Sequence, residues 1–200
     1  MMAYVAIVST NINVEKFAKK ILKNEPKIIK KYPAKTINLK EDFDGATGLG
    51  FNSLTSRSCH FNVLNWWGTG SLRKWIRSGY ETYNNVRKYR PLYVQCWANV
   101  MRKGQQIKSH KHEASNGTTP MNHLCGHLCI QVDGTTSTYY EGNPILNECG
   151  TMTLFPAHMH HWTDKYENNG ERITIAFDIL NEDFYNVDIL DEYKNHWVKI

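Results

Sequence analysis

Residues 150–177 read GTMTLFPAHMHHWTDKYENNGERITIAF. Two runs of β-branched and large apolar residues, 150–156 and 171–177, flank a connection that contains three histidines. Gly, Pro and Asn punctuate the segment, and its apolar side chains do not recur at the three- and four-residue spacing of a helix. The segment therefore predicts two short strands joined by a polar loop.

The same pattern of short β-prone runs separated by turn residues extends toward the N-terminus as far as residue 92. The further β-prone runs are LYVQCWANVM (92–101), HLCGHLCIQVD (123–133) and TSTYYEG (136–142). Several short strands at close spacing, separated by turn residues, are typical of an antiparallel sandwich or barrel. No helical stripe interrupts them, which disfavours a parallel sheet of alternating strands and helices.

The first ninety residues have a different pattern. A β-prone run at 3–9 precedes a helix that Asn11 or Asn13 can cap, and Ser71 can cap a second helix that ends before Pro91. We expect these helices to pack on a mainly β core. The chain is then one domain, 1–200, with an N-terminal region at residues 1–90, a β core at residues 91–180 and an acidic segment at residues 181–200.

The composition indicates the cellular compartment in which the chain folds. No window approaches the roughly 18 uncharged apolar residues of a membrane helix, and the start lacks the pattern of a secretory signal. Five cysteines are an odd number, which favours reduced thiols over a disulfide framework. We therefore expect a cytoplasmic protein. The abundance of lysine and asparagine is typical of AT-rich genomes, some of them viral.

The net charge of +5 permits an anionic partner, because lysines crowd the first forty residues. No aromatic residues alternate with these lysines, so a solvated helix face is favoured and nucleic acid is the less favoured partner. The sequence leaves open whether the substrate is a small molecule or a peptide. It also leaves the oligomeric state open.

Histidines occur at the spacing of metal ligands. His110 and His112 enclose one residue, and in an extended segment such side chains point to the same side. His158, His160 and His161 follow the predicted strand at 150–156 and offer a third imidazole. Two nearby imidazoles and a distant third can hold a metal ion on one face and leave positions open for substrate and dioxygen. Taken separately, each group could also be a solvated surface feature.

A second cluster alternates along one predicted strand and comprises His123, Cys125, His127 and Cys129. Two cysteines and two histidines are a chemically reasonable zinc site. However, a straight strand spreads four such side chains over about 20 Å. Structural burial is therefore the favoured interpretation.

Arg172 lies in the final β-prone run, with Thr174 two residues on and so on the same face. A guanidinium that points into a barrel needs an acid, and its planar fork suits a carboxylate. The carboxylate of a co-substrate meets that need. The alternative is an edge-strand arginine paired with Glu171 or Asp164.

Four motifs occur in order along residues 92–180, namely WANVMRKG (97–104), HKH (110–112), GTMTLFPAHMHH (150–161) and RITIAF (172–177). They resemble the WxNxxxxG, HxH, G(x)4FP(x)4H and RIxIxF pattern of a family of 2-oxoglutarate- and Fe(II)-dependent oxygenases. The resemblance implies a double-stranded β-helix of the jelly-roll or cupin-like type. It also implies that the chain hydroxylates a substrate that the sequence does not identify.

The resemblance carries roles onto particular residues. The iron ligands that it implies are His110, His112 and His161. Arg172, helped by Thr174, would hold the distal carboxylate of 2-oxoglutarate, and Asn99 would lie in the same pocket. The implied cofactors are Fe(II) and 2-oxoglutarate.

One departure concerns the ligand set. Most 2-oxoglutarate oxygenases have Asp or Glu where this chain has His112, so the site has three histidines unless Glu113 takes part or His112 lies behind the ligands without touching the metal. A shifted register ending at Ala114 resembles the HxA of related halogenases and is the least favoured choice. If His112 is a ligand, replacing it with Asp should tighten Fe(II) binding. A second departure is the long polar stretch 113–122, which we expect to be a mobile lid.

The main alternative shares the fold. Gly104, His110 and His112 also fit the opening of the cupin motif, but that motif expects Glu where this chain has Asn116 and Gly117. A cupin-like metal protein without 2-oxoglutarate chemistry is therefore the weaker match. A non-catalytic β-sandwich that retains a metal is the remaining alternative.

Overall fold

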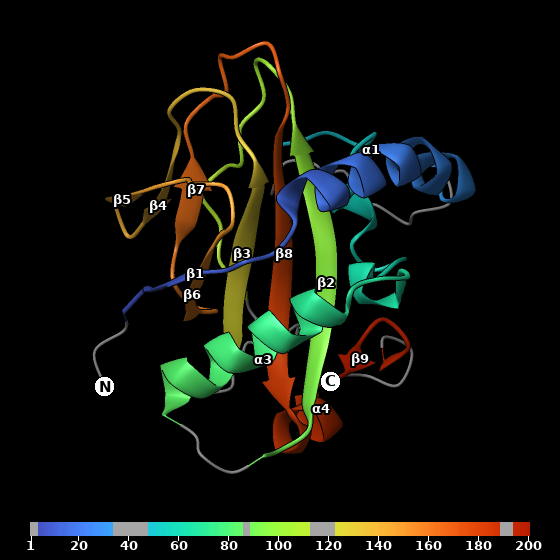
Figure 1. Cartoon of the computed structure of the whole chain (residues 1–200), viewed down its shortest axis with the longest axis vertical. Helices are drawn as coiled ribbons and strands as arrows, with labels where there is room; N and C mark the ends of the chain where they lie inside the picture. Colours follow the sequence, from blue (N-terminus) through green and yellow to red (C-terminus); the bar gives the residue numbers. More distant parts are fainter. Residues whose placement is uncertain (1–3, 34–47, 86–88, 113–122, 189–193) are drawn as a thin grey trace.

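The computed structural model describes residues 4–33, 48–85, 89–112, 123–188 and 194–200. Its strands form a six-stranded sheet in the order β1-β6-β3-β8-β2-β9 and a three-stranded sheet in the order β5-β4-β7 (Figure 1). All pairings between these strands are antiparallel. This two-sheet arrangement is that of a double-stranded β-helix, and the mainly β fold predicted from the sequence is confirmed.

The strands are β1 (Ala6–Ser9), β2 (Leu92–Met101), β3 (Leu124–Gln131), β4 (Ser137–Tyr140), β5 (Asn143–Leu146), β6 (Thr151–Pro156), β7 (His161–Thr163), β8 (Arg172–Asn181) and β9 (Val198–Lys199). The helices are α1 (Val14–Lys31), α3 (Gly70–Asn84) and α4 (Glu182–Asp188), with short 3-10 turns η2 (Thr55–Arg57) and η3 (Val63–Asn65). The predicted lid, 113–122, lies outside the described residues.

Each of the two N-terminal helices begins directly after a polar N-cap residue. Asn13 caps α1, because its side chain accepts a hydrogen bond from the backbone N–H of Lys16 at 2.9 Å. The second helix, α3, begins at Gly70 and not after Ser71, because Thr69 occupies the cap position. Thr69 directs its hydroxyl to the carbonyls of Leu64 and Trp66. No helix in the described ranges is long and apolar enough to cross a bilayer.

Both helices cover one face of the large sheet (Figure 1). Leu72 and Ile76 of α3 and Phe17 and Ile21 of α1 belong to one buried cluster with the apolar residues of β2, β3, β6 and β8. Burial of this apolar surface is the main stabilising contribution to the fold. The opposite face of the large sheet is turned toward the small sheet, and there the side chains become polar.

The pairing register of the central strands brings polar residues into contact. Asn99 of β2 lies opposite Thr174 of β8, and Cys125 of β3 lies opposite Asp178 of β8. Because side chains alternate between the two faces of a strand, these four residues share the face turned toward the small sheet. That face forms one wall of a cavity.

Candidate functional site

A cavity of about 420 Å³ lies between the sheets and is lined by side chains of β2, β3 and β8 together with β4, β7 and residues 107–112. The six site residues predicted from the sequence all line it: Asn99, His110, His112, His161, Arg172 and Thr174. Gln95 and Trp97 of β2 line it as well. Tyr93, on the same strand face, instead stacks on Tyr185 with ring centroids 3.7 Å apart.

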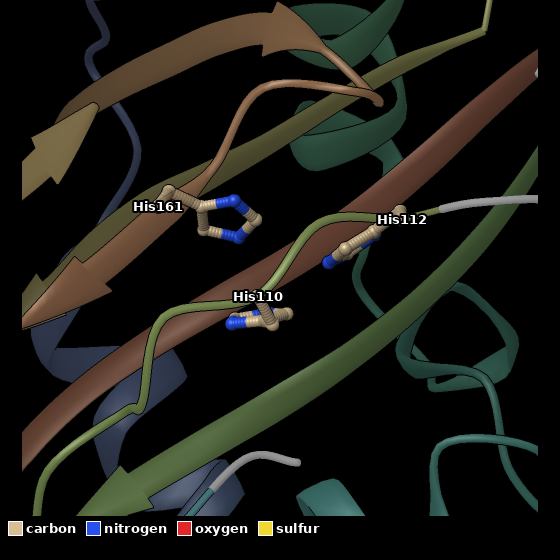
Figure 2. Close-up of side chains that lie close together, drawn as sticks. All are labelled: His110, His112 and His161. Atoms are coloured by element: carbon tan, nitrogen blue, oxygen red, sulfur yellow. The ribbon is translucent and has the colours of Figure 1, made fainter. Parts of the chain in front are cut away.

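Three imidazoles that line this cavity, those of His110, His112 and His161, lie close together (Figure 2). His110 and His161 form an isolated antiparallel bridge, in which each backbone N–H donates to the carbonyl of the other, at 3.1 and 2.9 Å. The backbone N–H of His112 donates to the carbonyl of Ala157 at 2.8 Å. One ring nitrogen from each histidine lies within 4.8 Å of those of the other two. Backbone hydrogen bonds thus bring together residues that are far apart in the sequence.

Each imidazole is oriented by a hydrogen bond at Nδ1. The acceptors are the carbonyl of Lys108 for His110 (2.8 Å), a carboxylate oxygen of Asp178 for His112 (2.7 Å) and the carbonyl of Met159 for His161 (3.1 Å). An imidazole that donates through Nδ1 and is neutral has its lone pair on Nε2. Metal-binding histidines have this arrangement, in which the second nitrogen donates to a fixed oxygen. The donor set therefore fits a divalent transition metal.

Burial sets the protonation of these rings. Burial, with a smaller contribution from the neighbouring histidines, lowers the pKa of His110 to about 4 and that of His161 well below its usual value. Burial also acts to lower the pKa of His112, but the charge and hydrogen bond of Asp178 outweigh it and raise that pKa. Burial would raise the pKa of Asp178, yet His112 lowers it to about 2. His110 and His161 are therefore neutral near pH 7.

The remaining predicted metal candidates lie elsewhere. His158 and His160 are exposed and do not line the cavity, so of the three histidines after β6 it is His161 that faces it. Glu113, the alternative ligand, and Ala114, which ends the shifted register that begins at His112, lie outside the described residues.

Arg172 lies in the same cavity and is almost completely buried, with 2% of its surface exposed. One of its terminal nitrogens donates to Thr138 Oγ1 at 3.0 Å and to Asn147 Oδ1 at 3.1 Å. Its Nε has no partner, and no carboxylate among the described residues pairs with the guanidinium. Asp164, one of the acids considered as a partner, accepts a hydrogen bond from Tyr139 instead. A buried cation without a counter-charge costs several kcal/mol, so this end of the cavity suits an anion.

Asn99 and Thr174 lie between the two ends of the cavity wall. The side-chain amide of Asn99 donates to Thr174 Oγ1 at 3.3 Å, and Thr55 Oγ1 donates to Asn99 Oδ1 at 2.6 Å. These contacts hold the Asn99 side chain in place at the cavity wall.

The cysteine and histidine cluster of β3 is buried, as predicted, but it also contributes to the cavity. His127 lines the cavity, and burial lowers its pKa to about 3. Cys125 forms a close group with His112 and Asp178, in which the ligand atoms lie within 4.8 Å of one another. Within the described ranges His123, Cys125, His127 and Cys129 form no metal-binding group by themselves, so the zinc site is not present there.

Asp178 is the residue that sequence reasoning missed. It contacts a candidate ligand and lines the cavity together with Arg172, Thr174 and Ala176 of the same strand. A signal was available, because Asp178 lies six residues after Arg172 and a period of two places both on one face.

No protein-family model and no curated protein matches this chain. Among solved structures, the viral collagen prolyl hydroxylase of Paramecium bursaria Chlorella virus-1, in complex with 2-oxoglutarate, is similar at a TM-score of 0.55 and 12% identity, over 88% of this chain and 95% of that one. A predicted oxalate decarboxylase of Thermotoga maritima is similar at a TM-score of 0.34 and 15% identity, over 43% of this chain. This chain spans 65% of the length of the decarboxylase. The first likeness shows that the two chains share the double-stranded β-helix fold.

Proposed function

We propose that this chain is an Fe(II)- and 2-oxoglutarate-dependent dioxygenase that hydroxylates a substrate still to be identified. The observation that carries the proposal is the buried Arg172, which has no acidic partner in the described structure and shares one cavity with three imidazoles. A metal site alone does not require that cation. A co-substrate that chelates the metal at one end and has a carboxylate at the other end accounts for both features.

The histidine end would hold the metal. His110, His112 and His161 would bind Fe(II) through Nε2, since Nδ1 of each ring is engaged with an oxygen. Bound Fe(II) supplies the activation of dioxygen that couples decarboxylation of 2-oxoglutarate to oxidation of a C–H bond. The protein contributes the fixed ring orientations and the neutral state of His110 and His161.

The arginine end would hold the distal carboxylate of 2-oxoglutarate. Nε–H of Arg172 is an unmatched donor, and the hydroxyl of Thr138 already orients a terminal nitrogen of the same guanidinium. Thr174, on the same strand face, lines the cavity beside it. Charge-assisted hydrogen bonds from a guanidinium to a carboxylate are about twice as strong as neutral ones, so this contact would dominate the affinity for the co-substrate.

Large side chains close part of the cavity wall. Trp97 and Phe155 are buried and line it, and Trp162 lines it at the level of β7. Their exclusion of water strengthens the electrostatic contact between a buried guanidinium and a carboxylate.

The test is anaerobic addition of Fe(II) and 2-oxoglutarate, followed by exposure to oxygen. We expect a weak visible charge-transfer band when both are present, and succinate once oxygen is admitted. Arg172→Met should lose both signals, whereas Arg90→Met, which removes an exposed arginine at the surface, should keep them. A wild-type protein that binds Fe(II) but gives neither a band nor succinate would contradict the proposal.

The alternative function is a cupin-like metal enzyme without 2-oxoglutarate chemistry. The observation that favours it is the donor set itself, in which all three candidate ligands are imidazoles and none is a carboxylate. The same experiment separates the two functions, because only a 2-oxoglutarate enzyme requires the co-substrate to produce the charge-transfer band.

A further inference from the structure

We infer that Asp178 is a positioning residue of the proposed metal centre, which holds His112 in its metal-binding orientation and supplies the negative charge that three imidazoles lack. The inference rests on the metal centre proposed above. It does not depend on 2-oxoglutarate being the co-substrate.

The contact between the two side chains is short and shielded from solvent. Nδ1 of His112 lies 2.7 Å from Oδ1 of Asp178, and the two side chains are 17% and 13% exposed. Hydrogen bonds in which one partner is charged are short and strong in this way. The bond keeps a proton on Nδ1 of His112 and leaves Nε2 free to bind a metal.

His112 depends on this bond more than the other two histidines depend on theirs. His110 and His161 donate to backbone carbonyls two residues earlier in their own segments, and their backbones are paired with each other. His112 belongs to no strand. Its backbone is held at the carbonyl of Ala157, and its ring is held by a carboxylate from a distant part of the chain.

Asp178 is a rigid anchor for that ring. Its backbone lies in the middle of the large sheet, opposite Gln95 of β2 on one side and Cys125 of β3 on the other. A strand paired on both sides has little freedom to move. The carboxylate therefore has a fixed position from which it can orient the ring of His112, which belongs to no strand.

The carboxylate also changes the charge of the site. A site with two histidines and one carboxylate places one negative charge directly on the metal, whereas three neutral imidazoles place none. In this chain the negative charge lies one imidazole away from the metal position. A carboxylate bonded to the second nitrogen of a ligand makes that ligand more basic and tightens metal binding.

This arrangement reverses one expectation from the sequence. By resemblance alone, His112→Asp creates the commoner ligand set and should tighten metal binding. However, Oδ1 of an Asp at position 112 is as many bonds from its Cα as Nδ1 of histidine, so it would lie against Oδ1 of Asp178. Two carboxylates at such a distance do not both ionise readily. His112→Asp should therefore weaken binding, and adding Asp178→Asn should restore part of it.

The experiment is an anaerobic titration of the metal-free protein with Co(II), followed by visible absorption. Asp178→Ala should weaken Co(II) binding about 10- to 100-fold, as loss of such a partner typically does. Asp178→Asn keeps an oxygen that can accept the hydrogen bond from His112, so its Co(II) affinity should fall less than that of Asp178→Ala. Asp164→Asn, which removes an exposed charge next to β7, is the matched control and should change binding less than about twofold. His112→Asp with Asp178→Asn should bind at least about tenfold more tightly than His112→Asp alone.

A second measurement tests orientation directly. In the metal-free protein at pH 8, the ¹⁵N shifts of His112 should report a proton on Nδ1, and Asp178→Ala should give a mixture of tautomers. Thermal melting of the metal-free variants shows whether they fold, and Asp178→Asn is nearly the same size as the native residue in case Asp178→Ala does not.

Different results overturn different claims. Unchanged Co(II) affinity in Asp178→Ala, or tighter binding in His112→Asp with Asp178 present, overturns the role of Asp178. A folded wild-type protein that binds no Co(II) overturns the metal centre and this role with it. A protein that binds metal in the expected order but does not consume 2-oxoglutarate overturns the proposed function and leaves the role of Asp178 supported.

Discussion

The two faces of strand β8 differ completely in chemistry. The face toward the helices carries Ile173, Ile175, Phe177 and Ile179, all of which are fully buried in one apolar cluster. The face toward the small sheet carries Arg172, Thr174, Ala176 and Asp178, which line the cavity. One continuous strand thus belongs both to the core and to the candidate site.

Adjacent residues of β8 therefore have different tasks: one contributes to the stability of the core, and the next lines the candidate site. The apolar face gains free energy from burial, whereas the polar face holds a buried guanidinium without an acidic partner among the described residues. A buried charge of this kind lowers the stability of the folded protein locally. Such losses are typical of functional sites, and the rest of the fold compensates for them. Substitutions on the two faces should therefore have opposite consequences, in the order that follows.

The largest effect is expected on the apolar face. Phe177→Ala should lower the free energy of unfolding by about 3–5 kcal/mol, because it removes a fully buried ring and leaves a cavity. Gly126 leaves space for this ring, since a Cβ there would lie 2.5 Å from it, so neighbouring side chains are packed closely around it. Urea unfolding measures the change, and Co(II) binding of the folded fraction should remain. A loss below about 1 kcal/mol would mean that this face is not the core.

On the histidine side, His161→Ala should weaken Co(II) binding by roughly two to three orders of magnitude. A structural zinc site binds with about 10–16 kcal/mol shared among four ligands, so one ligand contributes about 3–4 kcal/mol. The thermal melting of the metal-free protein should change little by comparison. His158→Ala, three residues earlier and exposed, is the control and should bind as the wild type does. Equal losses in both variants would show that His161 has no special role.

At the other end of the cavity, Arg172→Met should stabilise the metal-free protein by about 1–4 kcal/mol, since an apolar side chain replaces a buried charge that has no counter-ion among the described residues. The same change should reduce the affinity for 2-oxoglutarate by about 1.5–3 kcal/mol, the usual contribution of a hydrogen bond to a charged group. Urea unfolding and calorimetric titration measure the two effects. Lower stability together with unchanged 2-oxoglutarate binding would make Arg172 a structural residue.

Per pH unit and per side chain, the smallest effect is a dependence of stability on pH. Burial lowers the pKa of His110 to about 4 and that of His127 to about 3, and it lowers the pKa of His161 still more strongly. Between pH 6.5 and about 4, the unfolded chain binds protons at these histidines and the folded protein does not. Stability should therefore fall as the pH falls through this window, by up to about 1.4 kcal/mol per pH unit for each histidine.

Urea unfolding of the metal-free protein at pH 7, 6 and 5 measures this slope. His127→Gln should reduce it, whereas His158→Gln should not. His112 acts in the opposite direction, because its raised pKa stabilises the fold below pH 6.5 and that contribution is lost as the pH rises through the folded value. A constant stability from pH 7 to pH 5 would contradict the neutral, buried state of these rings.

Much of this architecture could be predicted from the sequence, because it depends on local patterns. Alternation of apolar and polar residues predicts the strands, and spacing together with the family resemblance singles out His110, His161 and Arg172. The roles of these residues stay predictions, but the cavity that contains them all is a property of the structure.

The rest depends on contacts between distant segments. Asp178 lies in a run of apolar residues, and nothing local shows that His112 reaches it from the other side of the cavity. The start of α3 is a smaller case, because Ser71 is a good capping residue but Thr69 is the N-cap, and its carbonyl accepts a hydrogen bond from the backbone N–H of Arg73. The contact between His112 and Asp178 depends on how distant segments meet, which a single sequence does not show, whereas the start of α3 depends on contacts within five residues of Thr69.

The backbone bridge between His110 and His161 bears on how the centre would load. Two reciprocal amide bonds already hold these residues together, so an incoming ion does not have to gather them from a loose chain. Folding and metal uptake are then separate events, unlike in zinc fingers, which fold only with their ion. A strong chelator should strip the centre reversibly, leave the far-ultraviolet circular dichroism unchanged, and return a protein that can be reloaded with whichever divalent metal is supplied.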